Sequence, residues 1–154
     1  MPDPIPIPFD TLESALLWSS GGEPLENEAL LSRATGQMYF TSTYGDADDD
    51  LPDDIEDGSL YVAVPHKKDL ALGRSLVLSF AEAHAPMHFQ MIESFFRHKG
   101  AYAKFKALLE RTQLMERWYV FEADATRRAL EAWAADNGFV VVDELSPPRT
   151  SDAP

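Results

Sequence analysis

The chain of 154 residues contains no cysteine. It can therefore form no disulfide framework, no thiolate zinc site and no cysteine nucleophile. It also has no run of about 18 apolar residues, the length that a membrane-spanning helix needs. Its first ten residues, MPDPIPIPFD, lack the basic segment and apolar run of a signal peptide. We therefore expect a bacterial-type cytoplasmic protein that does not associate with a membrane.

Sequence motifs for common catalytic and metal sites are missing as well. There is no G-x-S-x-G nucleophile turn, no phosphate-binding loop and no dinucleotide fingerprint. His84 and His88 are spaced like two metal ligands on a helix, but Pro86 lies between them and no glutamate follows His84, so structural or surface histidines are the simpler interpretation. The carboxylates of residues 46–57 alternate as in an EF-hand, but Leu51 stands where that loop needs glycine. We predict no catalytic residue, no metal site and no cofactor.

What the sequence does contain is an uneven distribution of charge. The formal net charge is -13, which argues against non-specific binding of the whole chain to nucleic acid or anionic lipid. Residues 45–58 form an acidic loop of mutually repelling carboxylates, namely Asp46, Asp48, Asp49, Asp50, Asp53, Asp54, Glu56 and Asp57. Residues 97–128 carry eight lysines and arginines against four carboxylates, a net charge of +4. The chain thus has one acidic and one basic region.

The apolar pattern predicts one domain, residues 1–144, with a small antiparallel sheet in its first half. The length and the apolar fraction of 45% are those of a single globular domain. Strands are expected at residues 28–33 and 37–43, joined by a turn in which Gly36 supplies a positive φ. A third strand, residues 60–64, completes the smallest sheet that is stable by itself.

The two ends of the chain are expected to be irregular. Proline alternates with other residues in the arm of residues 1–9, which favours an extended, polyproline-like conformation. Asp10 or Thr11 is then expected to cap a short helix. Residues 145–154 contain three prolines and are expected to form a disordered tail.

Residues 69–137 carry a helical period and are expected to form about four helices. Asp69 is a candidate N-cap for the first helix, and a proline begins the second. Gly100 is expected to end the second helix in the left-handed conformation, and Asn137-Gly138 should end the last one.

These patterns together predict an α+β fold that is mainly helical. The small antiparallel sheet packs against the helices, and residues 139–142 add a final strand to that sheet. A buried aromatic seam is expected to join the last two helices, formed by Tyr102, Phe105, Trp118 and Phe121.

The stretch from Gly100 to Phe121 reads GAYAKFKALLERTQLMERWYVF and carries the most specific pattern in the chain. The distinctive residues are Gly100-Ala101-Tyr102, Phe105-Lys106, Trp118-Tyr119 and Phe121, together with Tyr61 to Pro65, Trp133 and Asn137-Gly138. On these residues the chain resembles uncharacterised protein family 0158, a bacterial group without an assigned activity. Similar sequences tend to have glycine at the position of Gln113, so the break between the last two helices is expected to be less sharp here or to be made by Thr112. The resemblance implies a fold and leaves the activity open.

Five basic residues form the candidate binding surface: Arg97, Lys99, Lys104, Lys106 and Arg111. Single-stranded nucleic acid is bound by cations that track phosphates and aromatic rings that stack on bases, and Tyr102, Tyr119 and Arg117 could line such a surface. The simpler interpretation, favoured by the helical spacing of Phe105, is that the aromatic rings form the core while the cations face water. In a third interpretation the acidic loop folds over the basic helices, within one molecule or across a dimer.

The function predicted from these features is that of a non-enzymatic binding or regulatory module. It would use the basic helical face and the acidic loop, with an acidic protein or RNA as partner, and the aromatic helices could join subunits of a homo-oligomer. The alternative is an enzyme with an unfamiliar site in a cleft between sheet and helices, for which Glu93, His98 and Tyr119 could supply proton transfer. Such a site would bring titratable side chains with shifted pKa values within hydrogen-bond reach.

Overall fold

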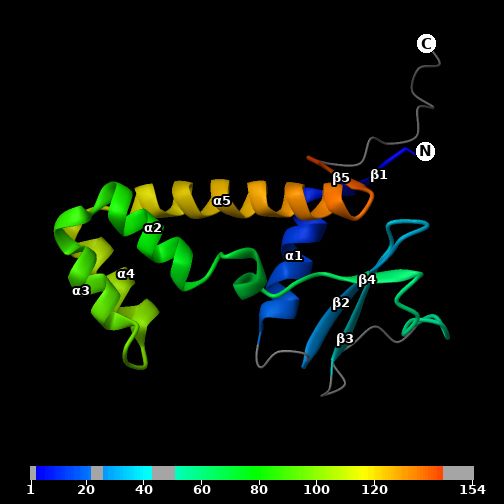
Figure 1. Ribbon diagram of the computed structural model, residues 1–154, viewed down its shortest axis with the longest axis horizontal. Coiled ribbons are helices and arrows are strands. Elements are labelled where there is room, and N and C mark those ends of the chain that lie inside the picture. Colours follow the sequence, from blue (N-terminus) through cyan, green and yellow to red (C-terminus); the bar gives the residue numbers. More distant parts are fainter. Residues whose placement is uncertain (1–2, 22–25, 43–50, 144–154) are drawn as a thin grey trace, which may run out of the picture. The chain divides into compact units, whose positions relative to one another are not determined.

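The computed structural model describes residues 3–21, 26–42 and 51–143, and Figure 1 shows its elements. The predicted α+β fold, mainly helical, is confirmed. The chain divides into two compact units: unit 1 comprises Met1–His66 with Ala129–Pro154, and unit 2 comprises Lys67–Arg128.

Unit 1 contains a three-stranded antiparallel sheet, as the sequence predicts. Its strands are β2 (Asn27–Ser32), β3 (Met38–Ser42) and β4 (Tyr61–Ala63), in the order β3-β2-β4. Gly36 in the β2–β3 turn has a φ of 79°, which confirms the expected positive φ. Its lack of a side chain is also required for packing, because a Cβ there would lie 2.9 Å from Cγ2 of Ile5.

Helix α1 (Phe9–Ser20) packs against this sheet and buries Leu12 and Leu16. The indole Nε1 of Trp18 donates to the backbone oxygens of Glu28 and Thr41, each at 3.1 Å, and so ties α1 to a facing pair of residues on β2 and β3. The predicted cap is wrong, because the helix starts directly after Pro8 and has no side-chain cap. The proline ring holds φ at -61°, which suits entry into a helix without a capping side chain.

The two ends of the described chain form a second sheet in unit 1. Strand β1 (Ile5–Pro8) pairs in parallel with β5 (Phe139–Val142). The expectation that residues 139–142 join the antiparallel sheet is therefore wrong. The extended arm can pair with β5 because successive residues of a strand direct their N–H groups to opposite sides, and the prolines of β1, which lack an N–H, fall on the side away from β5. On the side that faces β5, the N–H of Ile5 donates to the oxygen of Gly138 at 3.1 Å.

Unit 2 is helical. It contains α2 (Arg74–His84), α3 (Phe89–Phe95), α4 (Ala101–Thr112) and the first part of α5 (Met115–Asp136), with the 3-10 turns η1 (Lys67–Leu70) and η2 (Pro86–His88). The prediction that Asp69 caps the first helix is wrong. Asp69 lies inside η1, Ala71 follows with a left-handed φ of 56°, and α2 begins at Arg74 with Gly73 as its N-cap residue.

Two left-handed residues separate the helices of unit 2. Gly100 has a φ of 78°, as predicted, but it stands directly before α4, whereas α3 already ends at Phe95. Gln113 ends α4 with a φ of 60°. The turn therefore stays sharp without the glycine expected there, and it is made by Gln113 itself, whereas the hydroxyl of Thr112 donates to the oxygen of Leu108 within the helix.

The core of unit 2 is an aromatic cluster in which Trp118 packs edge-on against Phe105 and Phe80, with ring centroids 5.0 and 5.4 Å apart. All three rings are at most 2% exposed, and Phe121 joins them at 5.4 Å from Phe80. The predicted seam between α4 and α5 is thus present. Tyr102 is not part of it, because its side chain is 46% exposed.

We expect Gln113→Gly to raise the free energy of unfolding by about 0.5–1 kcal/mol, because a side chain in the left-handed region is strained and glycine is not. The matched control is Ala107→Gly, an exposed position inside α4, which should lower stability by about 1 kcal/mol. Urea denaturation of both variants provides the measurement. A loss of stability in both would show that Gln113 is not strained.

Phe105 and Tyr102 allow a paired test of the core, since both are aromatic and lie one turn apart on α4. Phe105→Ala should destabilise the protein by about 3–5 kcal/mol by leaving a cavity. Tyr102→Ala should cost about 1 kcal/mol, the value of a partly exposed aromatic contact. Equal losses in thermal or urea unfolding would contradict the burial described here.

Candidate functional site

The charges of the chain separate along the boundary between the two units. Unit 2 holds 11 of the 13 lysines and arginines and 7 of the 26 carboxylates, which gives it a formal charge of +4. Unit 1 holds the remaining 2 basic residues and 19 carboxylates, a formal charge of -17. The positive charge is therefore a property of a whole folded unit rather than of one stretch of sequence.

The basic residues of α4 all face solvent, but on two different flanks. Lys104 and Arg111 are exposed and seven residues apart, so they share one flank of the helix. Lys106 is also exposed, but at about 100° per residue it lies about 200° around the helix from Lys104. The buried side of α4 between these flanks carries Phe105 and Leu109. The basic side chains of α4 therefore do not form one helical face.

Arg97 and Lys99 are exposed in the turn between α3 and α4. Within the part of the chain that the structure describes, none of the five predicted basic residues takes part in an ion pair or a side-chain hydrogen bond. These cations can therefore bind an external anion without first breaking an internal contact.

A surface cluster of two aromatic rings and a cation lies in the same unit. The guanidinium carbon of Arg74 is 6.0 Å from the ring centroid of Phe96, and Phe96 packs edge-on against Tyr102 at 5.4 Å. Partial burial, together with the charge of Glu122, raises the pKa of the Tyr102 phenol, so the ring stays neutral. Tyr102 is a candidate from the sequence alone, but Arg74 is not, because nothing in the sequence links Arg74 to a ring 22 residues later.

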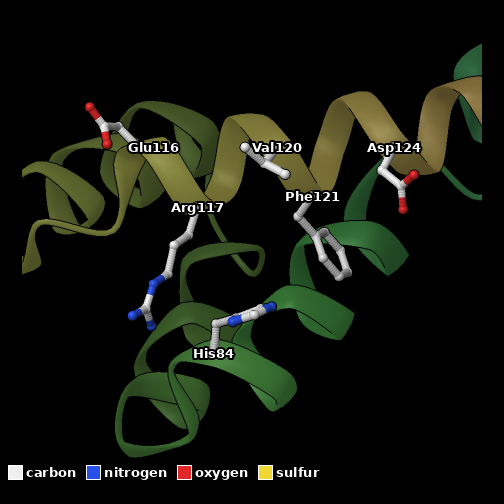
Figure 2. A pocket seen from close by; sticks show the side chains of 6 residues that line it. All are labelled: His84, Glu116, Arg117, Val120, Phe121 and Asp124. Atoms are coloured by element: carbon white, nitrogen blue, oxygen red, sulfur yellow. The ribbon is translucent and has the colours of Figure 1, made fainter.

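A groove with a volume of about 620 Å³ lies between α2 and α5 within unit 2, and Figure 2 shows its side chains. Its lining residues are His84, Glu116, Arg117, Val120, Phe121 and Asp124. The ring of His84 stacks on Phe80 at 5.0 Å and meets the edge of Phe121 at 5.8 Å, so this histidine forms one wall of the groove.

The structure places Arg117 in this groove, and Tyr119 is 52% exposed on the same helix. Glu93, His98 and Tyr119 are not joined by any hydrogen bond within the described residues. His84 likewise makes no hydrogen bond to another titratable residue of the groove in this part of the chain. The described residues contain no cluster of three or more histidines and carboxylates that could hold a metal ion.

Only the second half of the acidic loop lies within the described residues. There Asp57 accepts hydrogen bonds from the hydroxyl and the N–H of Ser59, at 2.6 and 2.9 Å, which lower the pKa of the Asp57 carboxyl. Residues 45–50 and the predicted tail, residues 145–154, extend beyond this part of the chain. The interpretation in which the loop covers the basic helices therefore stays a prediction.

No family model, no curated protein and no solved structure matches the chain. The resemblance to uncharacterised protein family 0158 stays a prediction that rests on the sequence residues named above.

Within residues 3–21, 26–42 and 51–143, no helix has the length and apolar character that crossing a bilayer requires.

The phenol of Tyr61 donates to Oδ1 of Asp54 at 2.8 Å. This hydrogen bond, together with smaller contributions from loss of hydration and nearby charges, raises the pKa of Tyr61 to about 12. The neutral phenol is favoured in the folded state, so its contribution to stability is complete below pH 10 and is lost as the pH rises through 12. We expect Asp54→Asn to lower the pKa of Tyr61 in an absorbance titration of the tyrosines.

Asp53→Asn provides a control with the same change of charge in the neighbouring residue. It should leave the highest tyrosine step in place, whereas Tyr61→Phe should remove that step. If Asp53→Asn and Asp54→Asn shift it equally, the general negative charge of the loop causes the shift and the hydrogen bond does not.

Proposed function

We propose that the protein is a non-enzymatic binding module whose unit 2 binds an anionic partner. The candidate binding residues are Arg97, Lys99, Lys104, Lys106 and Arg111, here called the basic surface, which includes both flanks of α4. The observation that carries this proposal is that all five side chains are exposed and form no internal ion pair within the described residues.

The physical basis is the release of counterions. A cation that contacts a phosphate displaces the small ions condensed on the nucleic acid, and the gain in entropy drives binding at low salt. The basic surface belongs to a unit with a net charge of +4, so the net field of that unit attracts anions. The large negative charge of the rest of the chain opposes binding of a polyanion elsewhere on the protein.

The cluster of Arg74, Phe96 and Tyr102 favours single-stranded RNA over an acidic protein segment as the partner. Tyr102 exposes 46% of its side chain close in sequence to Lys99 and Lys104. An exposed ring beside cations can stack on a base, and such stacking is worth about 1–3 kcal/mol per base. An acidic peptide would use the cations and leave the ring unused.

The test measures the fluorescence anisotropy of a labelled single-stranded RNA at several salt concentrations. Lys104→Glu is expected to weaken binding about tenfold and to reduce the salt slope by about 1, because one phosphate contact is lost. The matched control is Arg33→Glu, which makes the same charge change at an exposed residue in the β2–β3 turn of unit 1. Identical isotherms for these two variants would contradict the proposal.

Three further measurements identify the partner and the flank of α4 that binds it. RNA binding by Lys106→Glu tests whether the flank of α4 opposite Lys104 also contacts the partner. Tyr102→Ala should weaken RNA binding and leave the binding of an acidic peptide unchanged. A mononucleotide should bind to the wild-type protein much more weakly than the RNA or the acidic peptide, because it cannot reach several cations at once. If the peptide binds and the RNA does not, the partner is an acidic protein.

A further inference from the structure

The residues of α5 that line the groove have an apolar centre between two charged ends, with Glu116 and Arg117 at one end and Asp124 at the other. Figure 2 shows the carboxylate of Glu116 directed away from His84, whereas the side chain of Arg117 extends toward the His84 side of the helix. Arg117, Val120, Phe121 and Asp124 follow one another at helical spacing and so share one face. Val120 is 70% exposed. Figure 2 shows Arg117 and Asp124 on opposite sides of the two apolar residues along the helix. We call these four residues the α5 stripe.

The order of charges in the α5 stripe is self-complementary. The midpoint of the stripe lies between Val120 and Phe121, and Arg117 and Asp124 are equally far from it, about 5 Å along the helix axis at 1.5 Å per residue. Rotating a second α5 by 180° about an axis through this midpoint, perpendicular to the helix, brings its Asp124 opposite the first Arg117. The same rotation brings its Arg117 opposite the first Asp124.

We propose that the groove between α2 and α5 binds a second copy of this chain, forming a dimer in which the two α5 stripes lie antiparallel. Such an interface uses the same surface on both copies, so each contact occurs twice. Val120 of one copy enters the groove of the other, beside Phe121 and the ring of His84. The volume of about 620 Å³ has room for several apolar side chains.

The charged residues at the ends of the α5 stripe can pair across the dimer without breaking the existing ion pair of Asp124. Asp124 pairs with Arg128 on the next turn of α5, with both side chains exposed. A carboxylate has two oxygens and can accept hydrogen bonds from more than one donor. In the dimer Asp124 keeps Arg128 and gains Arg117 of the second copy.

The pattern of charge argues against other occupants of the groove. An acidic segment would match Arg117 but would meet Asp124, and a basic segment would have the opposite conflict. A segment with a negative end, an apolar centre and a positive end matches both, and the α5 stripe of a second copy is such a segment. A contact of about two helical turns is small, so we expect a weak dimer whose population depends on protein concentration.

Dimerisation is independent of the proposed anion binding. None of the five residues of the basic surface lines the groove. The oligomeric state can therefore be measured without RNA, and either proposal can fail while the other holds.

Sedimentation velocity over a wide range of protein concentration tests the dimer. The wild-type protein should shift from monomer to dimer as the concentration rises. Arg117→Asp and Asp124→Arg should each weaken self-association about tenfold, because each places like charges opposite one another twice across the two-fold axis. Glu110→Arg, an exposed charge reversal on α4 outside the groove, should leave self-association unchanged.

Mixing the two weakened variants provides the decisive measurement. Arg117→Asp places two negative residues in the stripe and Asp124→Arg places two positive ones, so a mixed dimer has opposite charges at both ends. The mixture should associate about as strongly as the wild type, although neither variant does so alone. A wild-type protein that stays monomeric at every concentration overturns the proposal. So does a dimer that neither substitution weakens, or a mixture that does not recover.

Discussion

The packing of Trp118 between Phe80 and Phe105 is the contact on which unit 2 depends. The three rings come from α5, α2 and α4, so burying them together holds three helices in contact. The indole N–H of Trp118 is buried without an acceptor among the described residues, which costs free energy that the surrounding aromatic contacts must offset. Once the inward face of each helix is set, the positions of the outward side chains follow from the helical geometry.

The two functional surfaces proposed here are consequences of this core. With Phe105 directed inward, Lys104 and Lys106 must point to solvent on separate flanks of α4. With Trp118 directed inward, the neighbouring residues Arg117 and Val120 line a groove beside it. The charged residues of the basic surface and of the α5 stripe are not part of the aromatic cluster, so substituting them leaves its ring contacts in place.

Several structural features could be predicted because they depend on residues close together in the chain. Gly36 and Gly100 both adopt the positive φ that was expected, since glycine has no side chain to oppose it. Pro86 interrupts the helices for an equally local reason, its missing N–H. The capping role expected of Asp69 failed because Ala71, an ordinary residue in the left-handed conformation, delays α2, and no pattern in the sequence signals such a residue.

The amino-acid sequence by itself determined the class of fold, the approximate positions of the strands and helices, and the concentration of positive charge in residues 97–128. Backbone preferences and the helical period act over a few residues, and these features need nothing more. Only the tertiary structure decided that β5 pairs with β1, that Arg74 lies over Phe96, and that His84 and Phe121 line one groove. Each of these contacts joins residues that are far apart in sequence, where packing rather than local preference selects the partner.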